Sequence, residues 1–213
     1  MIIARRSVVI GLGAGVFASR AAAAEHLRPT PQETFGPYFP VSMPADHDFD
    51  LTRVAGRPGR AAGQVIDLGG RVLRVDGSPV KDAAIAIWQA NAAGRYAHPM
   101  DKNQAPLDPN FQGAALVRTT AEGRYRVVTV KPGAYPDPAG GMRTPHIHFD
   151  VTADDYPLVT QMYFPGEALN ERDILMSTMA ARHRDPGLTV CKEVAAREPG
   201  VLRFEWDIVL LQA

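Results

Sequence analysis

Short runs of β-branched and apolar residues, several of them alternating with polar ones, follow one another from about residue 64 to the end of the chain. Alternation with a period of two is typical of strands that present one face to the core. Turn residues separate these runs, among them Gly69-Gly70, Asp-Gly-Ser-Pro at 76–79 and Glu122-Gly123. The pattern predicts strands at residues 64–68, 71–75, 83–89, 124–130, 146–152, 158–164 and 201–211.

The chain before these strands has a different character. Residues 25–62 are rich in proline and polar side chains and show no strand or helix period, so we expect an N-terminal arm that wraps over the body. Residues 170–184 are expected to be helical or irregular. Many short strands joined by Gly and Pro turns favour an all-β fold. The prediction is an antiparallel β-sandwich domain at residues 63–213, preceded by the extended arm.

The first 24 residues have the order of a secretory signal. Arg5 and Arg6 precede an apolar stretch of about a dozen residues, and small residues then lead to the polar Glu25. That stretch is too short to span a bilayer, so we expect no stable membrane anchor. The adjacent arginines resemble a twin-arginine signal, which predicts an exported, periplasmic protein. A buried N-terminal helix is the alternative, although the glycines of this stretch would weaken it.

Composition and charge narrow the class of protein. Lys plus Arg and Asp plus Glu both total 23, so the formal charge is zero and no field favours a nucleic-acid partner. The 18 prolines and 19 glycines favour turns over long helices. Cys191 is the only cysteine, which excludes an intrachain disulfide and a cysteine-rich zinc site. We expect it to be a small buried residue.

The clearest candidate for metal chemistry is Arg-Thr-Pro-His-Ile-His-Phe-Asp at residues 143–150. Alternate side chains of a strand point to the same face. His146 and His148 therefore project together, as two imidazoles on one metal must. The same spacing occurs in strands that bind no metal, so structural histidines are the alternative. Asp150 has the parity to complete a His-His-Asp set of the kind that holds ferrous iron.

Two tyrosines lie near these strands in loops. Tyr96 follows the strand at 83–89, and Tyr135 lies in Lys-Pro-Gly-Ala-Tyr-Pro at 131–136, ahead of His146. Each tyrosine taken alone is a candidate packing residue. The phenol has a pKa of about 10, so it is an anionic ligand at neutral pH only beside a strong Lewis acid. Two hard phenolate oxygens would favour ferric over ferrous iron.

Five pieces of the chain, in their order and spacing, resemble the intradiol ring-cleavage dioxygenases, most closely the iron-bearing subunit of the protocatechuate branch. They are Gly-Arg-Tyr at 94–96, Pro-Leu-Asp-Pro-Asn-Phe at 106–111, Val-Lys-Pro-Gly-Ala-Tyr-Pro at 130–136, Arg-Thr-Pro-His-Ile-His-Phe at 143–149 and Thr-Gln-Met-Tyr-Phe at 160–164. The arm segment 32–38 resembles the family's entry sequence. The resemblance implies a β-sandwich with long active-site loops and one Fe(III) per chain, held by Tyr96, Tyr135, His146 and His148.

The resemblance also implies a reaction. A catechol-type substrate chelates the iron, and O2 opens its ring between the two hydroxylated carbons to give a muconate-type diacid. Tyr135 would be displaced and take a substrate proton. Arg143 would stabilise the electron-rich ring, and Gln161 would hydrogen-bond an oxygen of the substrate. The alternatives are a salt bridge at a strand edge for Arg143 and a surface or cross-strand amide for Gln161.

A second class of protein fits part of the chain. Residues 70–84 resemble the opening of transthyretin-like and carboxypeptidase-associated β-sandwich modules, so an exported binding module without a redox metal is the alternative hypothesis. The sequence does not identify the catechol. Asp137 stands where close relatives often have an aromatic residue, so the pocket is expected to differ. The family's carboxylate-binding residues can come from a partner subunit, so a homo-oligomer or a hetero-oligomer with a related subunit is expected.

Overall fold

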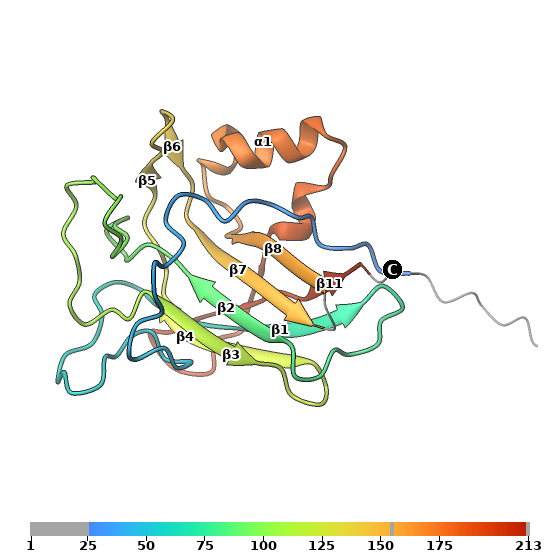
Figure 1. The fold of residues 1–213 in the computed structure, drawn as a ribbon, viewed down its shortest axis with the longest axis horizontal. Helices are drawn as coiled ribbons and strands as arrows, with labels where there is room; N and C mark the ends of the chain where they lie inside the picture. Colours follow the sequence, from blue (N-terminus) through green and yellow to red (C-terminus); the bar gives the residue numbers. More distant parts are fainter. Residues whose placement is uncertain (1–25, 154–155, 212–213) are drawn as a thin grey trace, which may run out of the picture.

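The computed structural model describes residues 26–153 and 156–211. The predicted signal at 1–24 lies outside these ranges. Two β-sheets form the body, and the apolar core lies between them (Figure 1). Across the described residues, no helix has both the length and the apolarity to cross a membrane. The predicted all-β sandwich is confirmed, and so is the burial of the free Cys191.

The first sheet has the strand order β11-β1-β10-β9, with β4 paired to β1. Its strands are β1 (Val65–Arg74), β4 (Arg124–Val130), β9 (Lys192–Val194), β10 (Leu202–Glu205) and β11 (Ile208–Leu210). The second sheet has the order β3-β2-β7-β8. Its strands are β3 (Ala114–Arg118), β2 (Ala84–Trp88), β7 (His146–Ala153) and β8 (Tyr156–Tyr163). β5 (Tyr135–Pro136) and β6 (Met142–Arg143) form a separate hairpin.

The core is built from alternate residues of facing strands. Ile66 and Leu68 of β1 lie in one cluster with Ile147 and Phe149 of β7, and all four are fully buried. Alternate residues of a strand point to opposite faces, so the even-numbered residues of β1 and the odd-numbered residues of β7 point inward here. On β7 the odd residues enter the core, so His146 and His148 point to the opposite face of the second sheet. The N-terminal arm covers that face.

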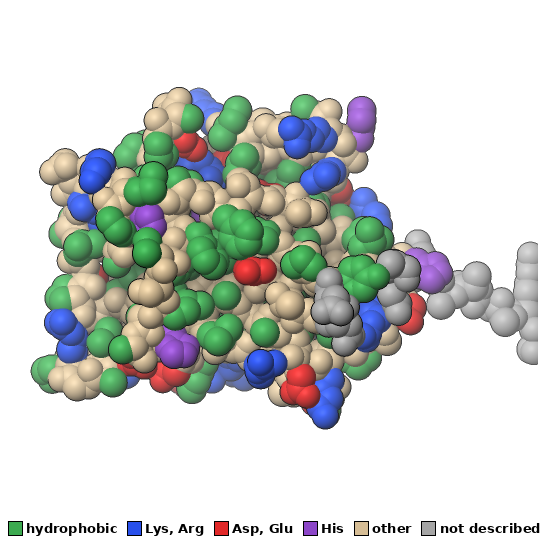
Figure 2. Space-filling view, in the orientation of Figure 1, with side chains coloured by type: hydrophobic (Ala, Val, Ile, Leu, Met, Phe, Trp, Pro, Cys, Tyr) green, Lys and Arg blue, Asp and Glu red, His purple; other side chains and the backbone are tan. Residues whose placement is uncertain are grey.

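The predicted arm lies across the second sheet, as Figure 1 shows for the blue segment in front of β7 and β8. The backbone N–H of Glu33 donates to the Val159 carbonyl at 2.8 Å, and the Thr160 hydroxyl donates to the Pro31 carbonyl at 2.9 Å. Figure 2 shows hydrophobic side chains gathered in the middle of this face. The arm therefore covers the outer face of β8, whose other face enters the core, and the histidine face of β7.

Two predicted strand boundaries were wrong. β1 runs without interruption through Gly69-Gly70, because β4 pairs with it there on one side and β10 on the other. The single strand expected at 201–211 is divided into β10 and β11. At the division, the carboxylate of Asp207 accepts the backbone N–H of Arg71 at 2.9 Å, so a side chain replaces a ladder carbonyl. Both halves pair with β1 in parallel, unlike the other ladders.

The region at 170–184 is helical, within the range expected. It contains η1 (Asn170–Arg172) and α1 (Ile174–Ala181), and η2 (Pro186–Thr189) follows. Asp173 caps α1, because its side chain accepts the backbone N–H groups of Leu175 and Met176. This cap places a carboxylate beside the β5–β6 hairpin, which matters for the site described next.

Candidate active site

The two histidines of the His-x-His motif lie side by side on β7, as strand parity predicted. Their Nε2 atoms are 3.2 Å apart, and both side chains are buried. The Trp88 ring stacks on His148 with centroids 4.7 Å apart and planes 8° apart. Trp88, Gln161 and Tyr163 are the cross-strand neighbours of the pair. The second sheet thus fixes both imidazole positions.

The two candidate tyrosines reach the same place from separate loops. The hydroxyl of Tyr135 lies 3.3 Å from Nε2 of His146. The rings of Tyr96 and Tyr135 are 5.2 Å apart and nearly perpendicular. Gly94 permits this approach, because it has φ +77° and a Cβ there would lie 2.2 Å from the Ala134 carbonyl oxygen. The structure therefore brings together all four predicted donors.

The hydrogen bonds of the histidines leave a lone pair that could bind a cation. Nδ1 of His146 lies 2.6 Å from the carbonyl oxygen of Thr144, which can only accept, so Nδ1 is the donor and Nε2 bears a lone pair. Burial is the main cause that lowers the pKa of His146 and of His148 well below the ordinary value. Both rings are therefore neutral at pH 7. The buried hydroxyl of Tyr96 has no hydrogen-bond partner among the described residues. A metal ion at this point would satisfy both groups.

The tyrosines cannot ionise unaided. Burial raises the pKa of Tyr96 well above its ordinary value and raises that of Tyr135 to about 12. Without a cation, both phenols keep their protons at neutral pH. A trivalent metal would reverse this preference, because a bound cation stabilises the deprotonated ligand. The donor set of two phenols and two imidazoles therefore fits Fe(III).

The alternative His-His-Asp set is not assembled. Within residues 26–153 and 156–211, no three His, Cys, Asp or Glu side chains are grouped so that they could hold a metal ion. Asp150 has the expected parity, but it lies two residues further along β7 toward the opposite end of the second sheet, paired with Ala86 and Val159. A metal at the histidines would therefore need ligands of another type, and the hydroxyl of Tyr135, 3.3 Å from Nε2 of His146, lies within reach of such a position.

Arg143 and Gln161 lie beside the four donors and are both buried. Nη2 of Arg143 donates to Oε1 of Gln161 at 2.7 Å, and Nε donates to Asp173 at 2.7 Å. Burial opposes the charge of Arg143, but Tyr163, Tyr135 and Asp173 outweigh it and raise its pKa further. The alternative roles considered for these residues, a salt bridge for Arg143 and a cross-strand amide for Gln161, are therefore partly correct. Arg143 is ion-paired with Asp173, and Gln161 accepts a hydrogen bond from Arg143 of another strand. These contacts orient both side chains next to the site.

Three residues of this network were not predicted as site residues. The Tyr163 hydroxyl donates to Glu33 at 2.9 Å, and Asp173 holds Arg143. Burial is the main cause that raises the pKa of Glu33 to about 7. Tyr163 shares the parity of Gln161, a signal present in the sequence. Asp173 has a helix-cap signal that does not reveal its partner, and Glu33 lies in the family-like arm segment 32–38, which does not reveal that it contacts Tyr163.

Comparison with known proteins defines the class. A family model described as "Dioxygenase" matches residues 34–212. The beta chain of protocatechuate 3,4-dioxygenase from Burkholderia cepacia is 45% identical over 78% of this chain and 72% of its own length. The alpha chain from the same organism is 31% identical over 84% of this chain and 91% of its own. The chain spans about half the length of catechol 1,2-dioxygenase 1 from Acinetobacter lwoffii.

Solved structures agree with the sequence relatives. The dioxygenase domain of a dioxygenase carbohydrate-binding protein fusion from Streptomyces sp. SirexAA-E has a TM-score of 0.66 and 27% identity. It aligns with 87% of this chain and 100% of that domain. The chain belongs to the intradiol ring-cleavage dioxygenases, a family of enzymes. The resemblance to the beta chain of protocatechuate 3,4-dioxygenase, found in the sequence, is confirmed.

Proposed function

We propose that this protein is a non-haem Fe(III) dioxygenase that cleaves a catechol-type ring between its hydroxylated carbons with O2, giving a muconate-type diacid. The observation that supports it is the pair of buried, neutral imidazoles whose Nε2 atoms approach to 3.2 Å beside two tyrosines. Tyr96, Tyr135, His146 and His148 would hold one iron. A transthyretin-like binding module would have no use for this donor set, and the family match disfavours it.

The iron, when bound, would supply the Lewis acidity that holds a doubly deprotonated catechol and draws electron density from its ring. The residues of the chain have complementary tasks. Tyr135 would be a phenolate while it holds the metal, and its phenolate oxygen could then accept a proton from a substrate hydroxyl. Arg143 presents a fixed positive charge beside the ring, and Gln161 presents an amide to a substrate oxygen. Because Arg143 is held by Asp173, its charge is preorganised before the substrate arrives.

A panel of catechols with oxygen uptake recorded tests this activity. We expect the iron-loaded protein to consume one O2 for each ring opened and to release a diacid. Tyr135→Phe should abolish turnover and shift or weaken the visible iron–phenolate absorption. Tyr125→Phe is the matched control, because Tyr125 is equally buried but its hydroxyl donates to the Trp206 carbonyl in the sheet core. A colourless, inactive iron-loaded protein would reject the proposal.

We also propose that the protein is oligomeric and that it is exported. The similarity to separate alpha and beta chains supports an oligomer, either of this chain alone or with a related subunit. Native mass measurement of protein purified from its own host distinguishes the two. The order of residues 1–24 supports export to the periplasm through a twin-arginine route. Replacing both Arg5 and Arg6 by lysine should then leave the protein in the cytoplasmic fraction.

A further inference from the structure

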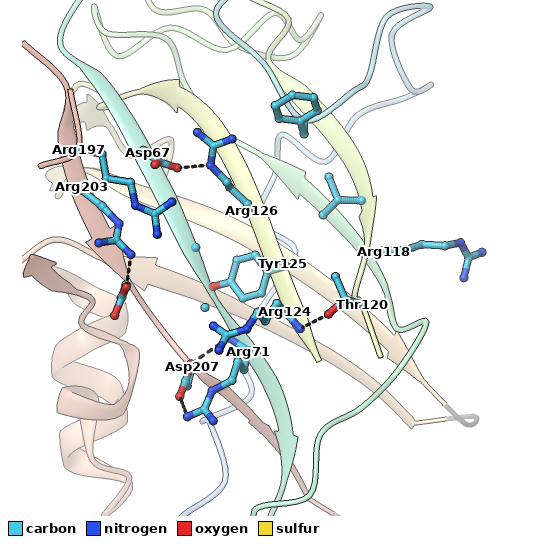
Figure 3. A pocket seen from close by; sticks show the side chains of 15 residues that line it. Asp67, Arg71, Arg118, Thr120, Arg124, Tyr125, Arg126, Arg197, Arg203 and Asp207 are labelled. Carbon is cyan, nitrogen blue, oxygen red and sulfur yellow. Dashed lines mark hydrogen bonds and ion pairs between the residues drawn. The ribbon is translucent and has the colours of Figure 1, made fainter. Parts of the chain in front are cut away.

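A hollow lies on the outer face of the first sheet, away from the four donors on the second sheet (Figure 3). Its volume is about 590 Å³, which is within the range of small-molecule sites. None of its lining residues belongs to the candidate active site. A ligand bound here would therefore not compete with the substrate.

Several arginines point into this hollow, because they occupy alternate, outward-facing positions of neighbouring strands. The outward residues of β4 include Arg124 and Arg126, and those of β10 include Arg203. Gly69 lies between Arg126 of β4 and Glu205 of β10 on the outward face of β1, where it leaves the backbone bare. The hollow is therefore open at its centre because one residue lacks a side chain, and guanidinium groups stand around it.

Charge is concentrated here although the whole chain is neutral. Six arginines but only three carboxylates line the hollow, which leaves an excess of three positive charges. The carboxylates are already paired, Asp67 with Arg126, Glu205 with Arg203 and Asp207 with Arg71. The remaining arginines are Arg118, Arg124 and Arg197.

These three arginines have little to neutralise them. Arg118 donates to the Asp82 carbonyl at 3.0 Å. In the described part of the chain, the guanidinium groups of Arg124 and Arg197 make neither an ion pair nor a hydrogen bond, and the charge of the exposed Glu122 acts on Arg124 only at longer range. The neighbouring ion pair of Arg71 and Asp207 is about half exposed, so it contributes little stability and can exchange for another anion. Planar guanidinium groups bind carboxylate and phosphate through two parallel hydrogen bonds.

We propose that this hollow, which we call the arginine hollow, binds a small multivalent anion that bears carboxylate or phosphate groups, with Arg124 and Arg197 as its principal contacts. The ligand would span the bare backbone at Gly69. It would exchange with water and counterions and involve no covalent step.

Calorimetric titration of the iron-loaded protein with citrate and with inorganic phosphate tests this proposal, with sodium chloride at matched ionic strength as the reference. We expect saturable one-site binding of at least one of the two anions and none of chloride. The Arg124→Ser/Arg197→Ser double variant should bind about tenfold more weakly or worse, because two charge-assisted contacts are lost. Citrate binding alone would identify the group recognised as carboxylate, and phosphate binding alone would identify it as phosphate.

The matched control is Arg172→Ser/Arg182→Ser, which removes the same charge from exposed positions at η1 and α1. It should change the affinity less than about twofold, since screening weakens distant charges. Catechol turnover should be unchanged in both double variants. Affinity that falls equally in the two double variants would reduce the effect to net charge and overturn the proposal, as would the absence of saturable binding by either anion.

Discussion

Replacing Asp173 by alanine tests whether a buried ion pair positions the active-site arginine. The Asp173 side chain is completely buried and that of Arg143 is 4% exposed, with Nε and the carboxylate 2.7 Å apart. Breaking such a pair costs about 3–5 kcal/mol, because the remaining charge stays buried without a partner. Loss of the helix cap at Leu175 and Met176 adds about 1 kcal/mol. We therefore expect Asp173→Ala to lower the free energy of unfolding by about 4–6 kcal/mol, a large share of a typical domain's stability.

Guanidinium denaturation of the metal-free protein, followed by circular dichroism, measures this loss. Asp185→Ala is the matched control, because Asp185 also caps a helix and pairs with an arginine, Arg28, but at 41% and 67% side-chain exposure. Its loss should be much smaller, since exposed pairs contribute little. Equal shifts of the two midpoints would show that the buried pair contributes no more to stability than the exposed pair. If Asp173→Ala does not fold, Asp173→Leu with Arg143→Met should recover much of the stability without restoring turnover.

Two further predictions concern the arm. Gly36→Ala should reduce the iron content, because its Cβ would lie 3.2 Å from Cε1 of His148. The control is Gly56→Ala, which has a similar positive φ but open space around its Cβ and should keep its iron. Equal loss of iron from the two variants, measured by elemental analysis, would count against this contact. The pKa of Glu33 is raised from 4.5 to about 7, so the folded state binds its proton more tightly and loses stability as pH rises through this window. Between pH 4.5 and 8, we expect the free energy of unfolding of the metal-free wild type to fall by up to about 3 kcal/mol more than that of Glu33→Gln. Parallel curves of unfolding free energy against pH for the two proteins would contradict the raised pKa of Glu33.

Local pattern predicted the strands that alternate clearly and the shared face of His146 and His148. It failed at Gly69-Gly70, because pairing with β4 and β10 overrides the turn preference of glycine. The short strands β3, β5, β6 and β9 were not predicted, since two to five residues give too little period to recognise. Parallel pairing of β10 and β11 with β1 depends on a connection that no local signal encodes.

The candidate site was predictable where one motif or a family pattern contained its residues. The four donors were named from such motifs, and their convergence is a property of the fold. Glu33 and Tyr163 meet across 130 positions of sequence, and Arg143 and Asp173 across 30. Contacts of this kind follow from how the arm and α1 pack, so composition and spacing could not reveal them.

The proposed function requires two phenol oxygens and two imidazole nitrogens to hold one iron. Anomalous diffraction at the iron edge, from crystals of the iron-loaded protein, tests it most directly. We expect a single strong peak in each chain within bonding distance of the hydroxyl oxygens of Tyr96 and Tyr135 and the Nε2 atoms of His146 and His148. A peak at any other site, or full iron content with no peak between these four atoms, would contradict it.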